Sequence, residues 1–66
     1  MSLKWSDVQE IAIGLAERHP DVDPRYLNFV ELHRWVLALP DFADHPSRGG
    51  EKVLEAIQAT WIEEAD

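Results

Sequence analysis

Four prolines divide this chain into stretches that are each short enough to form one helix. A proline inside a helix removes a hydrogen bond and clashes with the preceding turn, so helices end before it. Apolar residues recur with the helical period in three segments, residues 7–19, 29–39 and 51–65. We therefore predict a mainly α fold, a small three-helix domain over residues 1–66, with one extra short helical turn beginning at Pro24. This spacing favours helix-turn-helix or winged-helix-like packing.

Each helical segment places its apolar residues along one face, which predicts the core. We expect both Trp35 in the second segment and Trp61 in the third to be buried. The loop at residues 41–50 has Phe42 as its one large apolar side chain, and we expect this ring to hold the loop against the core. The predicted core faces comprise Val8, Ile11, Ala12, Leu15, Phe29, Leu32, Trp35, Val36, Leu39, Val53, Leu54, Ile57 and Trp61.

Polar residues at the segment starts predict how the helices begin. Ser6 followed by Gln9 has the spacing of a capping box, in which the hydroxyl accepts a helix N–H and the amide returns the bond. Asp23 directly precedes Pro24, so we expect its carboxylate to cap the extra turn. Asn28 is the nearest candidate cap for the second helix, which has no Ser, Thr or Asp at its start.

The last helix ends with Glu63, Glu64 and Asp66. Acids at a helix C-terminus are disfavoured by the helix dipole, by about 0.3–1 kcal/mol each. Such broken local rules are expected at functional sites, and a frayed, solvated tail is an equally simple interpretation.

The chain carries 13 Asp and Glu against 6 Lys and Arg, which gives a net charge of −7 at pH 7. Size scaling predicts a folded surface of only ~4,300 Å², so the negative field is dense. Such a field repels nucleic acid and anionic membranes, and it attracts cations and basic protein surfaces. There is no Cys to form a disulfide or a thiolate metal site, and no apolar run approaches a membrane span. We expect a cytoplasmic monomer that binds neither nucleic acid nor membrane.

The candidate chemistry is limited to carboxylates. The three His lack the spacing of a metal-binding pair, and we expect His33, beside an apolar face, to be structural. Asp41, Asp44 and His45 could surround a cation, but the segment lacks the Gly and Glu of a calcium loop. Oxygen-rich surfaces bind hard cations weakly, iron among them, and an ordinary solvated acidic surface is the alternative. So short a chain has little room for a catalytic cleft, and we do not expect an enzyme.

Several short motifs follow one another along the chain. They are Leu3-Lys4-Trp5, Pro20-Asp21-Val22-Asp23-Pro24, Leu32-His33-Arg34-Trp35-Val36, Asp41-Phe42, Glu51-Lys52-Val53-Leu54-Glu55-Ala56-Ile57 and Trp61-Ile62-Glu63-Glu64-Ala65. This ordered set resembles the IscX family, the small acidic proteins of bacterial iron–sulfur cluster assembly. The resemblance implies a modified winged-helix fold and a cytoplasmic adaptor that docks on the cysteine desulfurase IscS, with bacterial frataxin competing for the same area. It also implies weak surface binding of iron (Fe²⁺ or Fe³⁺), in the role of iron-dependent modulator or iron donor.

The acids then form two overlapping groups. The candidate iron ligands are Asp41, Asp44, Glu51, Glu55, Glu63, Glu64 and Asp66. The candidate docking residues are Glu10, Glu17, Asp21, Asp23, Glu55, Glu63 and Glu64. Set against the family pattern, Ala43 and His45 interrupt the acidic loop, and Ile13 stands where a further acid is usual. The alternative function is a small acidic helical protein-interaction domain with no specific iron site.

Overall fold

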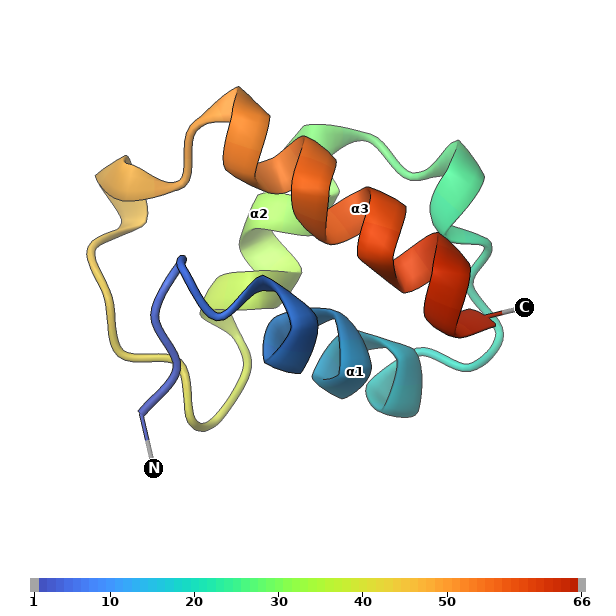
Figure 1. The fold of residues 1–66 in the computed structure, drawn as a ribbon, viewed down its shortest axis with the longest axis horizontal. Coiled ribbons are helices and arrows are strands. Elements are labelled where there is room, and N and C mark those ends of the chain that lie inside the picture. Colours follow the sequence, from blue (N-terminus) through green and yellow to red (C-terminus); the bar gives the residue numbers. More distant parts are fainter. Residues whose placement is uncertain (1, 66) are drawn as a thin grey trace.

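The computed structural model describes residues 2–65 and contains three α-helices joined by two longer connections, residues 19–28 and 38–50 (Figure 1). The elements in chain order are α1 (Val8–Arg18), η1 (Pro24–Tyr26), α2 (Phe29–Leu37), η2 (Pro46–Arg48) and α3 (Glu51–Ala65), where η marks a single-turn 3-10 helix. Within the described residues, strand-like pairing is confined to one parallel bridge between Leu3 and Phe42. The predicted mainly α class is confirmed, and the winged-helix comparison stays a prediction.

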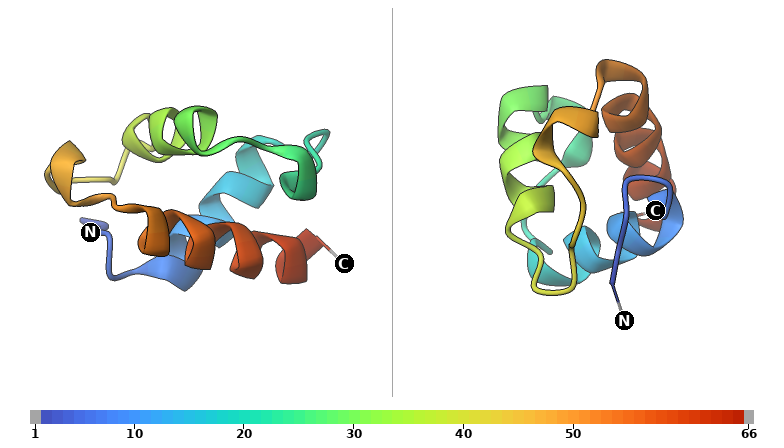
Figure 2. Two further views of the ribbon diagram at one scale, coloured as in Figure 1. Left: turned by 90° about the horizontal axis from the view of Figure 1, so that it is seen from above. Right: turned by 90° about the vertical axis from the view of Figure 1, so that its left-hand side faces the viewer.

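The longest helix, α3, is the element on which the others pack. It makes its most extensive contact with α1 and smaller contacts with α2 and η1. Figure 2 (left) shows α2 and α3 in separate layers, with α1 running obliquely from the level of α3 toward that of α2. The Gln58 side chain fixes η1 on α3, because its Nε2 donates to the carbonyl oxygens of Pro24 (2.7 Å) and Leu27 (3.3 Å).

The core confirms the predicted apolar faces of α1 and α3, but the burial of two tryptophans differs from the prediction. Trp61 is 1% exposed, as expected. The expectation that Trp35 is buried is wrong: the residue is only half-buried and packs against the buried core from outside, with its ring stacked on His19 just beyond the end of α1 at 4.2 Å between centroids. Trp5, which the helical periodicity did not include, is 4% exposed. The buried set is Trp5, Ile11, Ala12, Leu15, Leu32, Val36, Leu39, Leu54, Ile57 and Trp61.

The predicted capping box at Ser6 is wrong, whereas the other two caps are confirmed. The first helix begins at Val8, and no side chain caps it. The Asp7 carboxylate accepts the N–H of Lys4 (2.9 Å) instead, because the chain turns back on itself just before the helix. Asn28 accepts the N–H of Glu31 (2.8 Å), and Asp23 accepts the N–H of Arg25 (3.1 Å).

The second helix ends earlier than its periodicity indicates. It stops at Leu37, and the N–H of Leu39 bonds to the Val36 carbonyl in a tighter turn. The residue before a proline disfavours the α conformation, so the chain leaves the helix ahead of Pro40. Leu39 nevertheless stays buried, as its place in the apolar pattern predicted. The prediction of a plain loop over residues 41–50 missed η2.

The helices are short relative to a bilayer. A membrane span needs about 20 apolar residues, and α3 has 15 and carries several acids. In the part of the chain that the structure describes, none of the helices has the length and hydrophobicity to cross a membrane.

Replacing Trp61 with Ala should lower the free energy of unfolding by about 3–5 kcal/mol, because the ring lies in the middle of the core. Urea unfolding followed by far-UV circular dichroism measures this loss. Trp35→Ala is the matched comparison, with a smaller expected loss because that ring is half-buried. Equal losses for the two variants would contradict the difference in burial.

Candidate functional site

The acidic side chains lie on the surface, and residues 2–65 contain no buried polar or charged side chain. The accessible surface is 4438 Å², close to the ~4,300 Å² that size scaling predicts. Among the described residues, ion pairs join Asp23 to Arg25 and Asp44 to Arg48. The exposed acids outside these pairs are Glu10, Glu17, Asp21, Asp41, Glu51, Glu55, Glu63 and Glu64. Most of the negative charge is therefore accessible to a partner.

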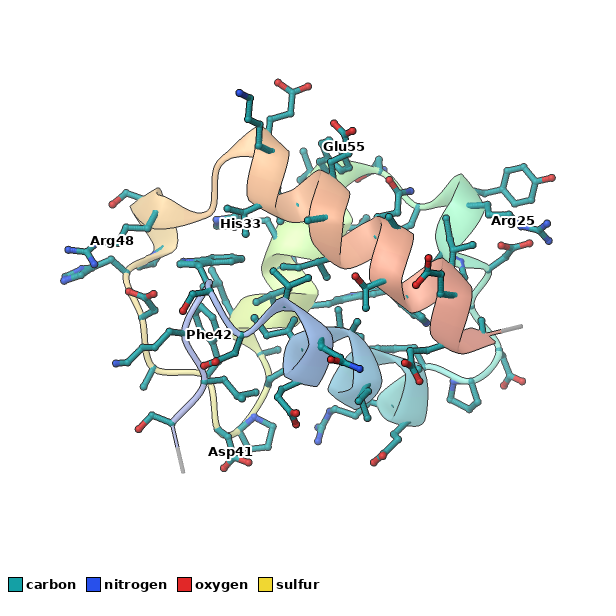
Figure 3. All side chains as sticks on the ribbon, in the orientation of Figure 1. Arg25, His33, Asp41, Phe42, Arg48 and Glu55 are labelled. Carbon is teal, nitrogen blue, oxygen red and sulfur yellow. The ribbon has the colours of Figure 1, made fainter. Side chains whose placement is uncertain are left out.

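The candidate iron ligands are spread over the molecule. Figure 3 shows Asp41 and Glu55 projecting from opposite sides. Across residues 2–65, no three His, Asp or Glu side chains come together in a way that could hold a metal ion. Asp66, the last of the candidate ligands, lies outside the described residues. A cation could therefore be bound by one or two of the described carboxylates.

The Asp44 carboxylate is engaged by its own loop. Its Oδ2 accepts the N–H of Trp5 (3.1 Å), and its Oδ1 accepts the N–H of His45 (2.7 Å). Arg48 lies 4.0 Å from the same carboxylate. These backbone donors, that of Trp5 first, hold the pKa of Asp44 below its usual value, with Arg48 adding a weaker effect. The ionised form of Asp44 therefore helps to tie the N-terminal segment to the loop.

The N-terminal segment and the loop after α2 lie side by side (Figure 1). The N–H of Leu3 donates to the carbonyl of Asp41 (2.7 Å), and the N–H of Ala43 donates to the carbonyl of Leu3 (2.9 Å). The Nζ of Lys4 also donates to the Ala43 carbonyl (2.6 Å). This pairing joins the backbone of Leu3 to that of Asp41 and Ala43, and it fixes where Asp41 stands.

Trp5 is the centre of this arrangement. Its Nε1 donates to the carbonyl of His45 (2.6 Å), and its ring meets Phe42 edge-on at 4.8 Å between centroids. On another side it stacks with His33 at 5.4 Å. The Nε2 of His33 is 2.8 Å from the Pro46 carbonyl, so the expectations of a structural His33 and of Phe42 holding the loop are confirmed.

Three acids gather around one groove, which we name the α1 groove. It has a volume of about 310 Å³ and lies between α1 and the turn that follows α2. Its floor is formed by Ile13, Gly14 and Leu39, and its acidic rim by Glu10, Glu17 and Asp41. Glu10 and Glu17 were predicted to share a face, because seven residues make two helical turns. Asp41, predicted as an iron ligand, joins them because the Leu3 pairing holds its backbone there.

Two more predicted docking residues line a hollow near the end of α3. Asp21 and Asp23 stand at its edge with Ile62 and Ala65. Asp23 binds the side chain of Arg25 (3.0 Å), and this contact, together with the Arg25 backbone N–H, lowers the pKa of the Asp23 carboxyl. This hollow is therefore less negative than its two acids alone would make it.

The acids of α3 form two further groups. Glu51 and Glu55 lie one turn apart on the same side of the helix, and both are exposed. Glu63 and Glu64 are exposed in the last turn, where the described residues include no basic side chain. The acids predicted to be unfavourable at this helix end therefore have no basic residue beside them in the described part of the last turn.

Replacing Gly49 with Ala should strongly destabilise the loop around Trp5. A Cβ at residue 49 would lie 2.5 Å from two atoms of the Trp5 ring, so the ring must move out of its site. We expect a loss of about 1–3 kcal/mol, measured by thermal or urea unfolding. Gly50→Ala is the control, since a Cβ there meets nothing within 4 Å. A Gly49→Ala protein as stable as the control would mean that Trp5 does not hold the loop in solution.

Replacing Asp44 with Asn should lower the free energy of unfolding at neutral pH. At acidic pH the variant and the wild type should differ much less. Because folding lowers the pKa of Asp44, its contribution is complete above the unfolded value of about 3.9 and disappears as pH falls through the folded value. The difference in unfolding free energy should therefore shrink below about pH 4. Urea unfolding of both proteins at neutral and acidic pH measures it, and a difference that does not change with pH would count against the ionised Asp44 contacts.

Comparison with known proteins agrees with these features. A family model described as iron–sulphur cluster assembly matches residues 3–66, almost the whole chain. An uncharacterized protein of Pseudomonas aeruginosa is 71% identical over 66 residues, and the match covers 100% of both chains. The small, mainly helical, acidic chain described above therefore belongs to the iron–sulphur cluster assembly family also known as the IscX family.

Proposed function

We propose that this protein is a non-catalytic adaptor and regulator of iron–sulfur cluster assembly that docks on the cysteine desulfurase IscS through its acidic surface. The observation that carries the proposal is the set of exposed carboxylates outside ion pairs, on a chain of net charge −7 that belongs to an iron–sulphur cluster assembly family. Fields of this size steer oppositely charged partners and favour fast association. The partner surface is accordingly a basic patch, and the protein acts in the cytoplasm as a monomer.

Frataxin competes for this patch under the same proposal, because a second acidic protein would seek the same positive surface. Regulation then follows from mutual exclusion, since whichever protein occupies the patch decides whether the other can act on the desulfurase. This mechanism needs no catalytic group in the adaptor. It uses only the charge and its placement on a rigid fold.

Iron enters the proposal as weakly held cargo or signal. Carboxylate oxygens suit hard cations, and Glu51 with Glu55 is the described pair best placed to share one, since both are exposed one helical turn apart. Two carboxylates without a third ligand support only weak binding. The alternative function is a small acidic helical protein-interaction domain with no specific iron site.

Anaerobic titration with Fe²⁺, followed by backbone amide signals, separates these two functions. Broadening confined to the side of α3 that carries Glu51 and Glu55 supports an iron site there. Glu51→Gln combined with Glu55→Gln should remove that broadening, and Glu10→Gln combined with Glu17→Gln is the matched control on α1. Uniform or absent broadening in the wild type would contradict an iron site and favour the alternative function, a protein-interaction domain without one.

Docking on the desulfurase should weaken as salt rises, because exposed charges are screened over about 10 Å at 0.1 M ionic strength. Affinity measured by calorimetry or interferometry at low and high salt tests this, with frataxin added as competitor. Reversing two charges, Glu63→Lys and Glu64→Lys, should leave the fold intact and weaken docking by roughly 3- to 10-fold. An affinity that is the same at both salt concentrations would eliminate docking by charge.

A further inference from the structure

The α1 groove combines two properties that no other described hollow has together. Its lining is largely apolar, and three exposed carboxylates, those of Glu10, Glu17 and Asp41, surround it. None of these three belongs to an ion pair within the described residues. Arg18 is the one cation on the lining, so the groove as a whole keeps a net negative charge.

The floor of the groove is left open by a glycine. Gly14 lies in the interior of α1, where glycine favours the helix less than alanine does. A Cβ at this position would lie 3.6 Å from Leu39, at ordinary van der Waals distance. A methyl group would therefore fit without strain, and its absence leaves room above Leu39 and beside the half-buried Ile13.

We propose that the α1 groove is the place where the desulfurase seats one apolar side chain, flanked on its own chain by Lys or Arg residues. This inference rests on the proposed function and assigns the docking contact to one face of the molecule. The apolar side chain would lie on Ile13, and the flanking cations would meet the carboxylates of the rim. Charge complementarity identifies the occupant, because an apolar floor between three carboxylates suits a basic, amphipathic segment.

The two parts of such a contact respond differently to salt. Burial of an apolar side chain depends little on ionic strength, whereas attraction between exposed charges is screened. Loss of the floor should therefore weaken binding by a similar factor at every salt concentration. Loss of the rim charges should weaken binding mainly at low salt and flatten its salt dependence.

Binding of purified IscS to full-length variants, at about 50 mM and about 300 mM salt, tests the proposal. Ile13→Gln removes the apolar floor, and Val30→Gln is its control, an exposed apolar residue on the outer side of α2. Glu10→Gln with Glu17→Gln removes rim charges, and Glu31→Gln with Glu51→Gln removes the same number from positions outside both the groove lining and the candidate docking residues. Thermal melting of each variant establishes that it is folded.

We expect Ile13→Gln to weaken binding about tenfold at both salt concentrations, with Val30→Gln within about twofold of the wild type. The Glu10 and Glu17 pair should reduce the salt dependence more than the Glu31 and Glu51 pair. Wild-type binding with no effect of Ile13→Gln, or a larger effect of Val30→Gln, would overturn the groove and leave the proposed function standing. A wild-type protein that does not bind the desulfurase would overturn both.

Discussion

The indole of Trp5 joins the N-terminal segment, the loop after α2 and α2 itself, and the positions of the loop acids Asp41 and Asp44 depend on it. It donates to the His45 carbonyl, packs against Phe42 and His33, and leaves no room for a side chain on Gly49. These contacts hold the loop in one conformation. The loop in turn directs Asp44 inward to the backbone and leaves Asp41 on the rim of the α1 groove.

The helices could be predicted from the sequence because their signals are local. Periodic apolar residues, prolines and the caps Asp23 and Asn28 act within one or two turns of chain. The prediction failed where distant segments compete for the same groups. Asp7 bonds to the turn before α1 and offers the helix no side-chain cap, and Trp5 is buried by residues about 40 positions further along. No periodicity within a helix reports such a contact.

The sequence predicted which acids lie on the candidate surface, but it predicted less well which of them lie together. Sequence separation placed Asp41 with Asp44, since they are three positions apart, whereas the structure assigns Asp41 to the α1 groove and Asp44 to the loop. Glu10 and Glu17 were paired correctly because both belong to one regular helix. Charge can be counted from a sequence, but its grouping across elements depends on tertiary contacts such as the pairing of Leu3 with Asp41 and Ala43.

The three tryptophans occupy different environments, and this gives the protein built-in optical probes. Trp35 and Trp61 have ring centroids 6.3 Å apart and share contact with the His19 ring, so their emission reports on the junction of the three helices. Trp5 lies apart from them, against His33 and Phe42, and reports on the loop. Variants that keep one tryptophan and carry Phe, which still fills much of the site, in place of the others would therefore separate loosening of the loop from loss of the helical core, and they would show which of the two a bound partner disturbs.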